Sequence, residues 1–72
     1  MHGSEVKQKY TIAVLTEKAI MNALHDHYLL VSIAYMEGKP VSAIVRDLYE
    51  QLAAIRRDKT LLKKLLEKEV KE

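Results

Sequence analysis

The residue types most able to carry out chemistry in this chain are three neighbours, His25, Asp26 and His27. Two histidines that are two positions apart point to different faces of a helix, so they do not form a metal-binding pair. Asp26 has no nucleophile with a matched base beside it, and the absence of cysteine excludes disulfides and cysteine-based zinc sites. We therefore predict no catalytic residue, no metal site and no cofactor, and we do not expect an enzyme.

The stretch that organises the rest of the chain runs from Gly38 to Arg46 and holds the only proline and one of two glycines. Gly38 suits the position just past the end of a helix, where a positive φ costs least. Ser42 is a good N-cap for a following helix, and Pro40 suits the turn between two helices. This stretch predicts a helix, a tight turn and a second helix.

Composition limits the core that the chain can build. Its 72 residues form one domain at most, and a monomer of this size has only a thin core. The net charge of +2 permits nucleic-acid binding without indicating it. The longest apolar run, Tyr28 to Met36, is too short to cross a bilayer. We expect a cytoplasmic protein, in the host cell if it is viral, that has no membrane contact and needs a partner subunit.

Residues 6–14 alternate between apolar and polar side chains for much of their length. One face carries Val6, Tyr10, Ile12 and Val14, and the other carries Lys7, Lys9, Thr11 and Ala13. Alternation with β-branched and aromatic residues predicts a strand, which would pair with the same strand of a second copy. The alternative is that these residues form the first turns of a long helix, against which their stiff β-branched side chains argue.

Thr16 predicts the start of the first helix, which would continue to Gly38. From Tyr28 onward this helix is apolar almost all round, so it must be buried on several sides, which again favours a dimer. The second helix is expected from Ala43 to about Asp58, where the apolar pattern is interrupted. A third, amphipathic helix would follow, and its leucines need a partner surface.

The order of strand, Leu15–Glu17 transition and Gly38–Ser42 turn resembles the ribbon-helix-helix family of DNA-binding proteins. The resemblance implies a homodimer that is mainly α with one short N-terminal β-strand, which forms an intermolecular two-stranded antiparallel ribbon. Residues 1–6 would be a flexible N-terminus, residues 7–57 the DNA-binding domain and residues 58–72 an added C-terminal helix. Two departures are a first helix about two turns longer than is usual, and Pro40 where the family has serine or threonine.

The resemblance implies that the ribbon lies in the major groove of double-stranded DNA. The expected base-contacting residues are those of its polar face, Lys7, Lys9, Thr11 and Ala13. The family's usual spacing from Thr16 would instead turn Tyr10, Ile12 and Val14 outward, which would leave lysines facing the core. The N-terminus of the second helix would bind a phosphate. The expected phosphate-contacting residues are Lys39, Val41, Ser42, Ala43, Arg56 and Arg57.

The resulting hypothesis is a sequence-specific DNA-binding protein, a transcriptional regulator and most simply a repressor, of the kind common in plasmids and viruses. Its C-terminal helix would be free to contact a protein partner. The alternative is an all-helical homo-oligomeric protein-interaction module that does not bind DNA. In that case residues 6–15 are helical, and Lys7, Lys9 and Thr11 are ordinary surface residues.

Overall fold

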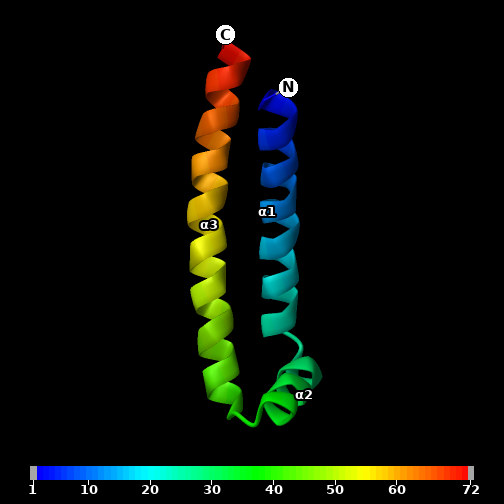
Figure 1. The fold of residues 1–72 in the computed structure, drawn as a ribbon. Coiled ribbons are helices and arrows are strands. Elements are labelled where there is room, and N and C mark those ends of the chain that lie inside the picture. The colour runs from blue at the N-terminus through cyan, green and yellow to red at the C-terminus, as the bar shows by residue number, and fades with distance from the viewer. Residues whose placement is uncertain (1, 72) are drawn as a thin grey trace.

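The computed structural model describes residues 2–71, with side chains described for residues 5–68, and over this range it is a hairpin of helices. The elements are α1 (His2–Leu24), α2 (His27–Glu37) and α3 (Val41–Lys71). α1 and α3 lie side by side and antiparallel, and α2 lies at the end where they are connected, so both chain ends lie at the other end (Figure 1). The molecule measures 50 × 17 × 15 Å.

The predicted N-terminal strand, and with it the ribbon-helix-helix fold, is wrong. Residues 2–71 contain no strand, and residues 6–14 belong to α1. The residues of α1 that face α3 recur at helical spacing, with Ala13 and Ile20 buried, whereas Ile12 of the supposed apolar strand face is 62% exposed. The helical disadvantage of β-branched residues is a few tenths of a kcal/mol each, ~0.5 or less, and packing along α3 outweighs it. In addition, the Thr11 hydroxyl donates a hydrogen bond to the Lys7 carbonyl at 2.9 Å.

The single first helix expected from Thr16 to Gly38 is also wrong, because the chain breaks at His25 and Asp26. Thr16 lies inside α1 rather than at its start. Asp26 has extended backbone angles and caps α2, its carboxylate accepting a hydrogen bond from the Leu29 amide at 3.1 Å. An aspartate with this geometry satisfies one of the free amides of the first turn. The break turns α2 out of line with α1.

The turn around Gly38 is confirmed as the end of a helix. Gly38 has φ 65° and ψ 34°, in the left-handed region, and its amide donates to the Tyr35 carbonyl. The next amide, of Lys39, donates to the Ala34 carbonyl at 3.0 Å. The following helix begins two residues earlier than predicted, at Val41, because the Pro40 carbonyl accepts the first hydrogen bonds of α3. Ser42 is therefore not its N-cap.

The break expected near Asp58 is absent, and α3 continues from Val41 to Lys71 as one helix. The hydroxyl of Thr60 donates to the Arg56 carbonyl at 3.0 Å, so Thr60 is bonded within the helix and does not cap a new one. The expected C-terminal helix, residues 58–72, is the second half of α3, with Glu72 outside the described residues. Of the expected flexible start, residues 1–6, Met1 is likewise outside the described residues, and α1 begins at His2.

The core is thin, as the chain length predicts. The buried apolar residues of the described range are Ala13, Ile20, Leu30, Ala34, Ile44 and Leu52. Leu30 and Ala34 of α2 pack with Ile44 of α3 in one cluster, which holds the short helix against the first turns of the long one. The remaining three, Ala13, Ile20 and Leu52, belong to α1 and α3, which lie side by side.

Candidate functional site: the groove between α1 and α3

The structure separates the residues that were expected to contact DNA. The expected base-contacting residues lie in the N-terminal half of α1, and Lys39 to Ala43 lie at the opposite end of the 50 Å molecule, beside α2 (Figure 1). Residues that contact the bases and residues that contact the phosphates of one DNA duplex have to share one surface. The base-contacting set and the Lys39–Ala43 set do not share one. The expected base-contacting residues also do not form one polar face, because Ala13 is buried against α3 while Lys7 and Thr11 are exposed.

Two of the expected phosphate-contacting residues are engaged within the chain. The Arg56 Nε donates to the Glu17 carboxylate at 3.0 Å, and the Lys59 ammonium lies 2.7 Å from the other carboxylate oxygen. Lys39 lies 3.9 Å from the Asp47 carboxylate, a looser and more exposed pair. Arg57 is exposed, and Ser42 is an exposed residue of the first turn of α3. The predicted phosphate set is therefore divided among the turn, an interhelical ion pair and open surface.

Glu17 joins α1 to α3. Its side chain is only 15% exposed and lies between two cations of the other helix. The hydrogen bonds from Lys59 and then from Arg56 hold the pKa of the Glu17 carboxyl below its ordinary value of 4.5. The sequence assigned Glu17 to the first turn of a helix, and its actual role depends on the register of α1 against α3. These contacts place residue 17 of α1 level with residues 56–59 of α3.

The other side of the hairpin is an apolar groove, which we call the groove face. Its two contiguous depressions, each of about 410 Å³, share Ile12 and Thr16. Both helices contribute side chains at alternating spacings of three and four residues. At these spacings the α1 side carries Lys9, Ile12, Thr16, Ala19 and Ala23, and the α3 side carries Leu48, Gln51, Ile55, Asp58 and Leu62. Ala13, Leu15, Ile20 and Leu61 also line the two depressions.

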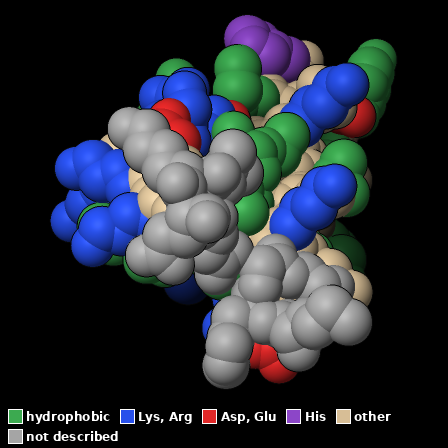
Figure 2. Space-filling view, turned by 90° about the horizontal axis from the view of Figure 1, so that it is seen from above, with side chains coloured by type: hydrophobic (Ala, Val, Ile, Leu, Met, Phe, Trp, Pro, Cys, Tyr) green, Lys and Arg blue, Asp and Glu red, His purple; other side chains and the backbone are tan. Residues whose placement is uncertain are grey.

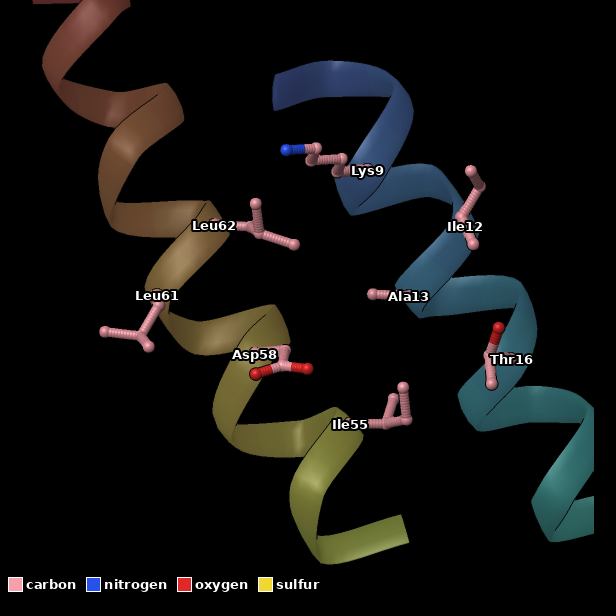
Figure 3. Close-up of a pocket in the computed structure, with 8 residues that line it drawn as sticks. All are labelled: Lys9, Ile12, Ala13, Thr16, Ile55, Asp58, Leu61 and Leu62. Atoms are coloured by element: carbon pink, nitrogen blue, oxygen red, sulfur yellow. The ribbon is translucent and has the colours of Figure 1, made fainter. Parts of the chain in front are cut away.

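The groove face carries large apolar side chains that are exposed to solvent. Ile12 and Leu15 are 62% and 60% exposed. In the depression nearer the two chain ends, the Lys9 and Asp58 side chains extend from opposite helices toward the gap between the helices (Figure 3). Seen along the helices, hydrophobic side chains reach the surface between basic ones (Figure 2). The groove therefore has an apolar floor with one charged residue of each sign on its walls.

α2 carries a second exposed apolar region, at the closed end of the hairpin. Tyr28, Tyr35 and Met36 are each more than four-fifths exposed. The sequence prediction that this segment must be buried on several sides is not met within one chain. Only Leu30 and Ala34 of α2 are buried, and they pack on α3.

The described residues offer no metal centre, since they hold no group of three or more potential His, Asp or Glu ligands. His25 and His27 are exposed on either side of the Asp26 cap. Within the described range, none of the helices combines the length and apolar character needed to cross a bilayer. Comparison of the chain with protein-family models, curated proteins and solved structures gave no match.

Sequence reasoning missed the groove face because it assigned its α1 residues to a strand and a cap. The signal was present, since residues 9, 12, 16, 19 and 23 follow the spacing of a helix seam. The small side chains Ala19 and Ala23 gave no sign of an apolar stripe, and Thr16 drew attention as a cap. Only the position of α3 shows that these residues border a groove.

Proposed function

We propose that this chain is an all-helical protein-interaction module that acts as a homo-oligomer through its groove face. The observation that carries the proposal is the exposed apolar groove of a hairpin with so thin a core. No cluster of catalytic groups competes for this site among the described side chains. DNA binding stays a prediction without its expected structural basis, the ribbon.

Surface area supports this proposal. A folded monomer of 8.3 kDa exposes about 4,600 Å² by the general scaling of area with mass, whereas this chain exposes 5850 Å². Its radius of gyration is 15.6 Å, against about 11 Å for a compact domain of this length. The excess area exceeds the roughly 800 Å² that each partner buries in a standard interface. A second copy packed along the groove face would cover part of this excess.

The test places an arginine in the groove and compares it with the same change elsewhere. Ala19 lines the groove, whereas Ala53 is an exposed alanine of α3 outside it. Ala19→Arg should weaken self-association by about tenfold or more, because a tenfold change needs only ~1.4 kcal/mol and an unpaired buried charge costs several. Ala53→Arg should leave self-association unchanged. Sedimentation equilibrium measures the dissociation constants, and far-UV circular dichroism confirms that each variant is helical.

Two results would refute the proposal. A parent chain that stays a folded monomer at the highest usable concentration would remove homo-oligomerisation. Equal effects of the two arginines would remove the groove as the interface. Titration of duplex DNA across a salt series tests the DNA hypothesis on the same samples. Binding that weakens steeply with added salt would show phosphate contacts and favour that hypothesis instead.

A further inference from the structure

We infer that the occupant of the groove is a second copy of this chain related by a twofold axis parallel to the helices, so that α1 of each copy packs on α3 of the other. This inference rests on the proposed function and specifies its geometry. The product is a four-helix bundle in which each long helix has two antiparallel neighbours. Both α2 helices then lie at the same end of the bundle.

The first support is that each long helix has two seams. On α1, the seam toward α3 within the chain comprises Tyr10, Ala13, Glu17, Ile20 and Leu24, all buried or partly buried. The groove seam, residues 9 to 23, has the same three-and-four spacing and lies beside it. Such spacing keeps a seam facing one neighbouring helix along several turns. Two adjacent seams therefore indicate two helical neighbours, of which one chain supplies only one.

The second support is the size of the side chains on the two walls. Toward α2, the groove seam of α1 carries the small residues Thr16, Ala19 and Ala23, with the buried Ile20 and the exposed Leu15 beside them, while the α3 wall carries Leu48, Gln51 and Ile55. An axis parallel to the helices places the large wall of one copy against the small wall of the other, the arrangement that fills a core best. An axis perpendicular to the helices would place α1 on α1 and α3 on α3. The large walls would then hold the small ones apart.

The third support is charge. Lys9 is on the α1 wall and Asp58 on the α3 wall, and neither belongs to an ion pair among the described side chains. A parallel axis preserves levels, so it places Asp58 of each copy level with Thr16 on the α1 wall of the other, about two turns from Lys9. A perpendicular axis through the middle of the groove would instead place the two Asp58 side chains on adjoining helices, within about two turns. The first arrangement pairs opposite charges and the second like charges, but over about two turns salt screens both interactions, so charge adds only a small preference for the parallel axis.

Cross-linking distinguishes the two axes, because the chain has no cysteine of its own. The Glu17 contacts place Thr16 level with Asp58, and both line the groove. A rotation about an axis parallel to the helices preserves levels, so Thr16 of one copy should lie level with Asp58 of the other. Full-length Thr16→Cys and Asp58→Cys chains are treated with a short bis-maleimide, each alone and as an equilibrated mixture, and mass spectrometry identifies the products.

We expect the mixed product in the mixture and little product from either variant alone. Product from Thr16→Cys alone, without the mixed species, would overturn the parallel axis while leaving the proposed function intact. A dimer that gives no cross-linked product in any of the three samples would also overturn the parallel axis. Sedimentation of the same samples identifies the separate case of a monomeric chain, which removes both the proposed function and this inference.

Charge reversal gives a second measurement that does not depend on cysteine. Asp58→Lys should raise the dimer dissociation constant, and adding Lys9→Glu in the same chain should lower it again. Both positions are exposed in the single chain, so the hairpin itself should fold. Tighter dimerisation of Asp58→Lys alone would overturn the parallel axis, because it would show that the Asp58 side chains repel each other in the dimer.

Discussion

Replacing Gly38 with alanine should lower the free energy of unfolding by about 1–2 kcal/mol, the cost of a left-handed backbone for a residue with a Cβ. The magnitude follows from the geometry of the turn. Gly38 has φ 65°, and a Cβ built there would meet nothing within 4 Å. There is therefore no clash to add, and the backbone conformation sets the whole effect.

Thermal and urea unfolding, followed by circular dichroism at one fixed chain concentration, measure this loss. For a chain of this size each kcal/mol corresponds to a fall of about 4–8 °C in Tm, and the fixed concentration matters because association shifts apparent stability. Asparagine, which tolerates the left-handed region, should cost less than alanine.

Chemical synthesis of the 72-residue chain allows the sharpest control, D-alanine at position 38. It favours positive φ and restricts the unfolded chain, so it should match or exceed glycine in stability. L-Alanine as stable as glycine, or D-alanine less stable than L-alanine, would refute the left-handed turn and with it the arrangement of α2 on α3.

Ile44→Ala should lower the free energy of unfolding by about 2–5 kcal/mol, because Ile44 is only 3% exposed in the cluster that holds α2. Met36→Ala, at an 83% exposed site, should change it by no more than ~0.5 kcal/mol in urea titrations, and equal losses would contradict the described core. Glu17 should stabilise the hairpin fully above pH 4.5, its ordinary pKa, since Lys59 and Arg56 lower the pKa in the folded chain. That stability should be lost as the pH falls from 4.5 through the lowered pKa. In a pH series, Glu17→Gln should lack this acid-side loss, and parallel curves for the two proteins would contradict the ion pair.

The N-terminal segment shows why the strand prediction failed. A Tyr-Thr-Ile-Ala-Val run (residues 10–14) has the composition of a strand, and local preferences there differ by only a few tenths of a kcal/mol per residue, ~0.5 at most. Burial of one large apolar side chain contributes about 1.5–3 kcal/mol. The neighbours available for burial therefore decided the conformation, and they lie more than 30 residues away on α3, at positions such as Leu62.

The candidate site could be predicted only in part. The apolar residues of so small a chain predicted a partner subunit, which stays a prediction. The location of the groove depends on which faces of α1 and α3 meet, and Glu17 illustrates the difficulty. Its two cationic neighbours, Arg56 and Lys59, are distant in sequence, and no local pattern pairs them.

By itself, the sequence determined the features that depend on one residue and its immediate neighbours. Gly38 ends a helix because it alone adopts the left-handed conformation there without strain, and the helix-forming composition favoured helices around it. Only the tertiary structure decided the conformation of residues 6–14 and the break at Asp26. It also decided the continuity of α3 past Asp58 and the existence of the groove. The physical reason is that local preferences were small, whereas burial depends on contacts between residues far apart in the chain.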